Sequence, residues 1–363
     1  MRLVLCVINR MLFNTLLCTF SVTSKLQDVR MTQITINKEF QQSAVADPYS
    51  ALIAVIRPIL YGLLYSLKQD VVREVGGYEN VKLKMLPRLR REGDGDIGIC
   101  FEYAVHDAIR RRDPLITEKV HDALTNHCRV PGQHIESILF GAEKSGSLSL
   151  IDTAHNVLTE ESRVLTGSQS QPPKLKFYLS KIAEAFRFRN LRDELPRSIK
   201  GLWKADLFLG YTDSQRWVGT TVKINPNSLE GAEGLRIGIV PAQYGRSDLI
   251  QFDQNRNLVV CPLPYDASFM EVFYHSWAIV SQFINADANT PKEVNLPAPL
   301  HRMVVQLLTD RREYGVLEVI QALDSLAQPH LLAPQPLHAD VQSVDQKVMT
   351  TNSLISPMPS RNA

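Results

Sequence analysis

The chain has 363 residues, which suits one buried core with additions better than two large domains. Apolar residues make up 44% and charged residues 21%, an ordinary globular composition that argues against wholesale disorder, a collagen-like repeat or a coiled coil. The formal net charge is only +2, so any basic surface for a nucleic acid must be local.

The first twenty residues are apolar, but Asn9, Arg10 and Asn14 interrupt them and no clear cleavage site follows, so we do not predict a secretory signal. The sequence from Met31 is typical of the start of a cytosolic protein. Translation is therefore interpreted as beginning at Met31, with residues 1–30 an artefact of the assigned start site. The five cysteines are widely spaced and form no CxxC pair, which favours free thiols in a reducing compartment. We therefore expect a cytoplasmic protein.

Helical spacing of apolar residues begins at residues 47–75, where Pro58 predicts a bend and the Gly76-Gly77 pair predicts the end. Arg57, Pro58 and Gly62 interrupt this stretch, so no membrane span is predicted. A second helix is expected to start near Ile97. The same spacing predicts further helices over residues 115–126, 150–158, 177–190, 267–284, 301–308 and 314–327.

Alternating apolar stretches appear only after residue 196, and they predict strands over residues 205–211, 216–224, 235–240 and 258–264. The sheet is therefore expected in the second half of the chain. The predicted organisation is an N-terminal segment (1–46), a helical region (47–170), a core with C-terminal helices (171–333) and a disordered tail (334–363).

The strongest chemical pattern lies between residues 204 and 225. Asp206 opens one predicted strand, and Lys223 lies on the next, beyond a polar turn at residues 212–214. Facing side chains of paired antiparallel strands lie about 5 Å apart, so a carboxylate and a lysine here can flank one metal ion. The alternative is structural, since an Asp at a strand start often caps a turn and a Lys on a strand often faces water.

This order of an acid, a turn and a strand ending in x-x-Lys resembles the PD-(D/E)xK nuclease superfamily. The resemblance implies an α/β, restriction endonuclease-like fold, in which helices flank a mixed central sheet, with helices added at both ends. It implies Asp206 as the principal metal ligand, Lys223 as the catalytic lysine, and Glu102 on an upstream helix as a supporting ligand. It also implies Mg²⁺ or Mn²⁺ as the cofactor and DNA as the partner. The match covers the hairpin and one helix.

The chain departs from the family pattern two residues before the lysine, where the family has Glu or Asp and this sequence has Thr221. A hydroxyl carries no charge and is a poorer Mg²⁺ ligand than a carboxylate. Asp213 in the turn and Glu143 are the candidates for an acid that has moved.

A local basic run precedes the hairpin, with nine lysine and arginine residues against three acidic ones over residues 174–204. Aromatic residues alternate with the basic ones, as on surfaces that contact a nucleic-acid backbone. The alternative is a solvated helix whose aromatic side chains enter the core. The nucleic-acid-binding residues predicted from this run are Lys181, Arg187, Arg189, Lys200 and Lys204.

Histidines and a cysteine between His121 and His134 match no zinc-site spacing, so no zinc site is predicted. The leading expectation is a metal-dependent endonuclease of restriction or antiviral-defence type. One alternative is a catalytically inactive nuclease-fold module that binds DNA or a partner protein, and another is a helical interaction protein. A protein partner or a homo-oligomer is compatible with each of these.

Overall fold

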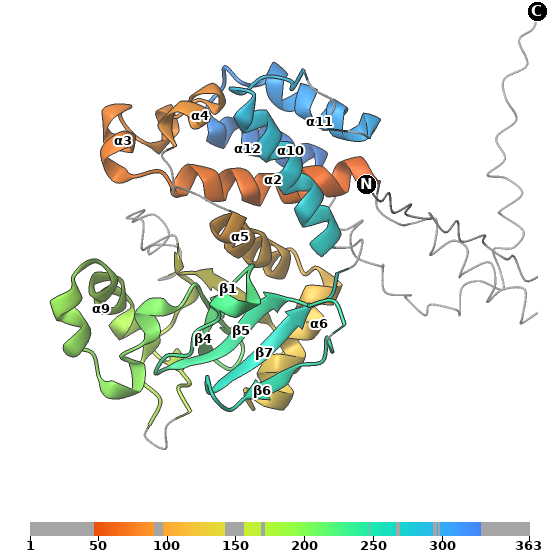
Figure 1. Cartoon of the computed structure of the whole chain (residues 1–363). Helices are drawn as coiled ribbons and strands as arrows, with labels where there is room; N and C mark the ends of the chain where they lie inside the picture. The colour runs from red at the N-terminus through yellow and green to blue at the C-terminus, as the bar shows by residue number, and fades with distance from the viewer. Residues whose placement is uncertain are drawn as a thin grey trace, which may run out of the picture. The chain divides into compact units, whose positions relative to one another are not determined.

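A seven-stranded mixed sheet organises the part of the chain that the structure describes (Figure 1). This computed structural model describes residues 47–90, 97–141, 156–167, 171–245, 247–265, 269–292, 296 and 298–327. All of them belong to one unit, Ala44–Ala363. The predicted N-terminal segment and C-terminal tail lie outside the described residues, as do Cys6 and Cys18, whereas Cys100, Cys128 and Cys261 are free thiols.

The sheet has the strand order β1-β3-β4-β5-β7-β6, and β2 pairs with β4 beside this path. Strand β3 runs antiparallel to its neighbours β1 and β4, whereas β4, β5 and β7 are parallel and β6 closes the edge antiparallel. The strands are β1 (Ile135–Leu139), β2 (Arg163–Val164), β3 (Leu207–Tyr211), β4 (Arg216–Val222), β5 (Leu235–Pro241), β6 (Gln251–Asp253) and β7 (Leu258–Leu263). This mixed open sheet with flanking helices confirms the predicted α/β class.

Nine α-helices are described: α2 (Pro48–Tyr65), α3 (Gln69–Glu74), α4 (Leu86–Leu89), α5 (Ile97–Arg110), α6 (Pro114–Asp122), α9 (Leu175–Arg187), α10 (Met270–Asn285), α11 (Pro299–Asp310) and α12 (Val316–Leu326). Short 3-10 turns span Tyr78–Asn80, Leu83–Met85, Arg189–Asp193, Arg197–Ile199, Leu202–Lys204 and Pro226–Ser228, and a π-helical turn spans Ala123–His127. Of the predicted helix over 150–158, residues 150–155 lie outside the described residues.

The single helix predicted over 47–75 is instead two helices, α2 and α3. Asp47 caps the start of α2, because its side chain accepts a hydrogen bond from the Tyr49 backbone N–H. Ser66 ends α2, and its hydroxyl donates to the Leu63 carbonyl, an alternative partner that competes with helix continuation. Lys68 is extended before α3 begins.

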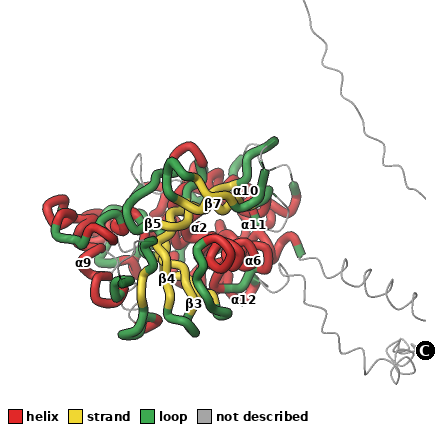
Figure 2. Tube along the Cα trace, turned by 90° about the horizontal axis from the view of Figure 1, so that it is seen from below, coloured by secondary structure: helices red, strands yellow, loops and turns green. Residues whose placement is uncertain are grey.

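The two faces of the sheet pack against different helices. Leu207, Val218 and Ile237 point into the larger core, which α2, α5, α6, α10 and α12 complete. Phe208 and Trp217 point to the opposite face, where α9 covers a smaller core. Figure 2 shows α6 and α9 on opposite sides of strands β3 to β5. Strands β3 and β4 are thus buried on both faces, and of their residues only Arg216 is partly exposed.

Helix α2 is the one described helix long and apolar enough, by length and composition, to cross a membrane, and 78% of that stretch is buried inside this fold. It packs against α5, α10 and α12. Its burial is that of a core helix and is compatible with a protein that does not cross a membrane.

Three of these helices are joined by a cluster of two arginines and two aspartates. Arg57 of α2 lies 3.1 Å from Asp324 of α12 and 3.7 Å from Asp107 of α5. Arg111, directly after α5, binds the same two carboxylates at 2.8 Å each. The four charges cancel, so the cluster ties α2, α5 and α12 together without a net buried charge.

This cluster predicts a loss of stability in acid. The hydrogen bond from Arg111, together with the charge of Arg57, holds the pKa of Asp324 below its ordinary value of 3.8. A carboxylate with a lowered pKa stabilises the folded state above pH 3.8, and this contribution is lost as the pH falls through the lowered value. We expect the melting temperature to fall more steeply below pH 4 in the wild type than in Asp324→Asn. Equal slopes would contradict this role.

Candidate functional site

The β3–β4 hairpin brings the two predicted catalytic residues together. Asp206 lies directly before β3, and its backbone N–H donates to the Thr220 carbonyl at 2.9 Å. Lys223 lies directly after β4, and its backbone N–H donates to Ile239 of β5. Both residues are therefore fixed by backbone hydrogen bonds at one end of the central strands, where β4 and β5 end side by side.

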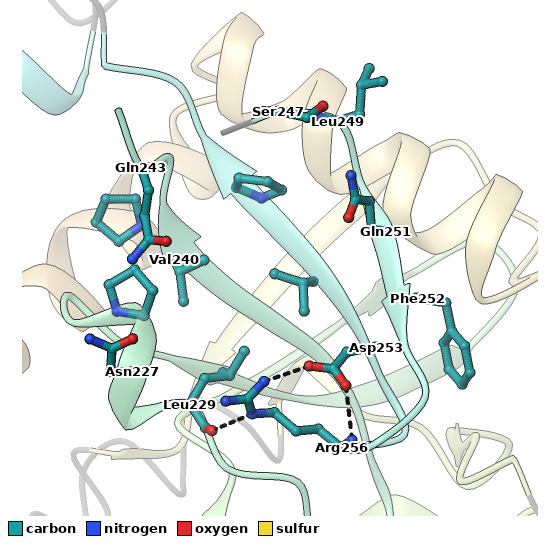
Figure 3. Close-up of a pocket in the computed structure, with 14 residues that line it drawn as sticks. Asn227, Leu229, Val240, Gln243, Ser247, Leu249, Gln251, Phe252, Asp253 and Arg256 are labelled. Atoms are coloured by element: carbon teal, nitrogen blue, oxygen red, sulfur yellow. Dashed lines mark hydrogen bonds and ion pairs between the residues drawn. The ribbon is translucent and has the colours of Figure 1, made fainter. Parts of the chain in front are cut away.

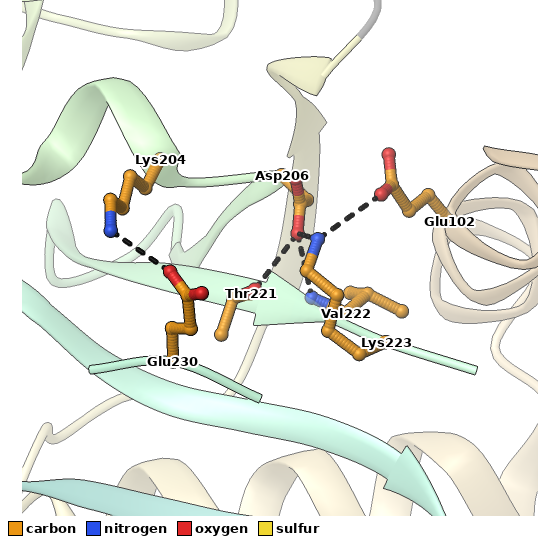
Figure 4. Close-up of polar contacts among 7 residues, drawn as sticks. All are labelled: Glu102, Lys204, Asp206, Thr221, Val222, Lys223 and Glu230. Atoms are coloured by element: carbon orange, nitrogen blue, oxygen red, sulfur yellow. Dashed lines mark hydrogen bonds and ion pairs between the residues drawn. The ribbon is translucent and has the colours of Figure 1, made fainter. Parts of the chain in front are cut away.

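The Asp206 carboxylate is almost fully buried, with 5% of its side chain exposed. Its Oδ2 accepts hydrogen bonds from the Thr221 hydroxyl and the Val222 backbone N–H, both at 2.9 Å, and from Lys223 Nζ at 2.8 Å (Figure 4). A buried carboxylate is costly unless such donors compensate it. The donors therefore fix this side chain in one orientation.

Glu102 reaches the same place from α5. Its Oε1 lies 3.6 Å from Lys223 Nζ, so the lysine contacts both carboxylates (Figure 4). Strand β1 positions the helix, since α5 packs along β1. After β1 the chain turns at Gly141, whose backbone N–H donates to the Asp206 carbonyl at 2.8 Å. The three residues that the nuclease resemblance singled out thus lie in one cluster.

Charge balance in this cluster favours a protonated lysine. Burial would lower the pKa of Lys223, but the neighbouring carboxylates of Asp206 and Glu102 outweigh it and raise the pKa above 10.5. One ammonium accordingly faces two carboxylates. The arrangement can hold a cation, or it can serve as an ion pair that joins the ends of β3 and β4 to α5.

Gly141 leaves the space that the Glu102 carboxylate occupies. A Cβ at this position would lie 2.8 Å from Glu102 Oε2 and 3.6 Å from the Asp206 carbonyl oxygen. Because the closer atom is the end of a flexible side chain, Gly141→Ala is expected to displace Glu102 at little cost in stability. We expect a fall in any activity that needs Glu102, with the melting temperature nearly unchanged. Unchanged activity in Gly141→Ala would show that the position of Glu102 does not matter for activity.

Asp213 and Glu143 were the candidates to replace the acid that is missing at Thr221, and the described residues show neither of them beside Asp206. Asp213 accepts backbone hydrogen bonds from Gln133 and His134, so it fastens the turn at the other end of the hairpin. Glu143 lies outside the described residues. Thr221 contributes a hydroxyl that donates to Asp206. Among the described residues, no group of three or more His, Cys, Asp or Glu side chains suits a metal ion.

Two of the predicted nucleic-acid-binding residues have acidic partners. Lys200 pairs with Asp193, and Lys204 pairs with Glu230 at 3.0 Å. Lys181 lies on the exposed side of α9, with Nζ 5.2 Å from the Phe177 ring, and Arg187 and Arg189 are exposed near the end of that helix. Phe177 and Phe188 are more than half exposed, which favours a surface role for them over a place in the core.

Two cavities of the fold were not indicated by the sequence pattern. One, of about 510 Å³, lies over β5, β6 and β7, where Arg256 binds Asp253 and the Leu229 carbonyl (Figure 3). The other, of about 440 Å³, lies between α2 and α5. Neither is lined by Asp206 or Lys223, so the polar cluster, rather than cavity size, marks the candidate site.

Comparison of the chain with protein-family models, with curated proteins and with solved structures found no match in any of the three.

Proposed function

We propose that this protein is a metal-dependent endonuclease that hydrolyses phosphodiester bonds in DNA and acts in the cytoplasm in restriction or antiviral defence. The observation that carries the proposal is the meeting of Asp206, Glu102 and Lys223, which lie directly before β3, on α5 and directly after β4. Glu102 lies more than a hundred positions before Asp206 and Lys223 in the sequence, and its approach to their hairpin supports the nuclease proposal.

The two carboxylates suit Mg²⁺ or Mn²⁺, because Mg²⁺ takes one or two protein carboxylates and keeps several waters. In the proposed site Asp206 and Glu102 would hold the ion. When bound, the metal would polarise the phosphoryl oxygen and favour hydroxide formation from water. The donors on Asp206 Oδ2 keep that carboxylate in place, and the Lys223 ammonium would offset negative charge on the phosphate.

Within the proposal, the DNA surface is α9 and the chain that follows it. The exposed side chains of Lys181, Arg187 and Arg189 would contact phosphates, and Lys200 and Lys204 would do so by exchanging their direct contacts with Asp193 and Glu230. We expect Arg189→Ala to weaken DNA binding more than Lys200→Ala and to reduce the salt dependence of binding by about one phosphate contact. Fluorescence anisotropy across a salt series measures both effects. Equal weakening by the two substitutions would contradict this assignment.

The second candidate is a catalytically inactive nuclease-fold module that binds DNA or a partner protein. Thr221 favours it, because this position supplies a hydrogen bond to Asp206 instead of a third carboxylate. The direct ion pairs of Lys223 favour it as well, since a lysine between two acids is already a satisfied structural unit.

One experiment separates the two candidates. Purified protein is incubated with plasmid and single-stranded DNA in Mg²⁺, in Mn²⁺ and in EDTA, and Lys223→Met is tested beside the wild type. The endonuclease proposal predicts metal-dependent cleavage that Lys223→Met lowers by about 10²-fold or more while DNA binding persists. Binding by the wild type without cleavage in either metal supports the inactive module. Cleavage undiminished in Lys223→Met overturns the assigned site.

A further inference from the structure

The cavity between α2 and α5 carries an unusual set of side chains for a groove of its size. Three tyrosines line it together with three arginines, and His106, Asp107, Pro58 and Leu139 complete the wall. Its volume of about 440 Å³ falls within the range of small-molecule sites, about 300–1,000 Å³. None of these residues belongs to the cluster around Asp206.

The tyrosines form a row of parallel rings. Tyr61 and Tyr65 lie one helical turn apart on α2, with ring centroids 6.1 Å apart and ring planes within 7° of each other. Tyr103 of α5 continues the row, 6.3 Å from Tyr65 and within 10° of its plane. Tyr61 and Tyr65 are half-buried, so their rings are held by the fold while part of each remains accessible. Fixed aromatic faces of this kind stack on nucleobases.

The arginines at this cavity divide into two that are held in ion pairs with aspartates and one that is accessible from solvent. Arg57 and Arg111 are committed to Asp107 and Asp324. The Arg110 side chain is 56% exposed and lies 3.7 Å from Glu136, a longer and weaker ion pair. Arg110 is therefore the arginine here that is best placed to bind a phosphate from solvent.

His106 adds a neutral hydrogen-bonding group. Burial, with the nearby charge of Arg110, lowers the pKa of His106 to about 3, so the ring is uncharged at neutral pH. Its Nδ1 lies 2.9 Å from the Ser137 hydroxyl on β1. A neutral imidazole pairs with the amide-like edge of a base without adding a charge.

The cavity adjoins the proposed catalytic cluster. His106 follows Glu102 by four residues on α5, about one helical turn of 5.4 Å. Leu139 precedes Gly141 by two residues, and the space over Gly141 holds the Glu102 carboxylate.

We propose that the cavity between α2 and α5 binds one unpaired nucleotide, with its base on the half-buried rings of Tyr61 and Tyr65 and its phosphate at Arg110. The buried ring of Tyr103 lies beside Tyr65. The link between this pocket and Glu102 rests on the proposed nuclease function. It narrows the substrate of that function to DNA that is single-stranded or frayed next to the cleaved bond. A free mononucleotide presents the same chemistry, so both sources are tested.

The test measures binding in EDTA, where no metal-dependent cleavage occurs. A labelled single-stranded oligonucleotide and the same sequence as a duplex are titrated with wild-type protein, Tyr61→Leu, Tyr61→Phe and the control Tyr314→Leu. Tyr314 is exposed between α11 and α12 and lines a different groove. A second titration adds dAMP as competitor, and thermal unfolding shows that each variant is folded.

The inference predicts that Tyr61→Leu weakens single-strand binding by about 5-fold to 100-fold, as expected for one stacked base. Tyr61→Phe keeps the ring and should stay close to the wild type, as should Tyr314→Leu and duplex binding by all variants. Competition by dAMP, or binding of dAMP that depends on Tyr61, also supports a nucleotide pocket. The inference is overturned if the wild type binds neither the single strand nor dAMP. It is also overturned if folded Tyr61→Leu binds both as the wild type does.

Failure of this inference and failure of the nuclease proposal give different results. If Tyr61-dependent binding is found but no DNA is cleaved in Mg²⁺ or Mn²⁺, the pocket stands and the hydrolytic function falls. If DNA is cleaved through Asp206 and Lys223 but Tyr61→Leu changes neither binding nor cleavage of single strands, the pocket falls alone.

Discussion

Asp206→Asn is expected to lower metal-dependent DNA cleavage by at least about 10³-fold while the fold is retained. Metal chemistry contributes several kcal/mol to phosphodiester hydrolysis, and each 1.36 kcal/mol changes the rate about tenfold. The amide matches the carboxylate in shape but loses the charge that would hold the ion. One oxygen remains to accept from Thr221 and Val222, so stability should fall by only about 1–3 kcal/mol. Plasmid nicking rates and thermal unfolding measure the two effects.

Asp213→Asn is the matched control for this substitution. Asp213 also accepts backbone hydrogen bonds, but at the turn of the same hairpin and away from Lys223. We expect cleavage by Asp213→Asn within about threefold of the wild type, with a similar small loss of stability. Cleavage that survives in Asp206→Asn, or falls equally in both variants, would show that Asp206 does not hold the ion.

Arg57→Leu is expected to destabilise the protein by about 3 kcal/mol. Only 7% of the Arg57 side chain is exposed, and its removal leaves Asp107 and Asp324 facing Arg111 alone. Breaking a buried pair from one side costs about 3–5 kcal/mol, and the partial exposure of Asp324 favours the lower end. The melting temperature should fall by about 5 °C.

Arg197→Leu serves as the comparison for Arg57→Leu. The Arg197 side chain is 93% exposed and lies 3.6 Å from Glu233, so its removal should change stability by no more than about 0.5 kcal/mol. If the two arginine variants unfold at the same temperature, the charge cluster does not join α2, α5 and α12 as described.

The central strands and long helices could be predicted from the sequence because most of their residues are buried. Strands β3 and β7 carry unbroken apolar runs, Arg216, Thr220 and Thr221 interrupt the run of β4 and Arg236 that of β5, and α10 shows one broad apolar face. Strand β1 escaped prediction because Glu136 and Ser137 interrupt it, and both side chains contact α5 through Arg110 and His106. Strands β2 and β6 have two and three residues, too few for any periodicity.

In the candidate site, the hairpin pattern predicted that Asp206 and Lys223 meet, since antiparallel register is a local property. The approach of Glu102 depends on how α5 packs on β1, and only the family resemblance pointed to it. The role of Gly141 was not predicted, because the missing side chain matters only once the Glu102 carboxylate lies over it. The tyrosine row likewise joins α2 to α5 through Tyr65 and Tyr103, which are far apart in the sequence, and no local pattern indicates such a pair.

The most direct test of the central claim is to locate the metal. Crystals of the protein soaked in Mn²⁺ are examined by anomalous scattering. A manganese peak bound by the carboxylates of Asp206 and Glu102, and lost in Asp206→Asn, is the result expected if this cluster is a metal-dependent hydrolytic site. An undisturbed ion pair between Lys223 and the two acids at saturating Mn²⁺, with no peak beside them, would contradict it.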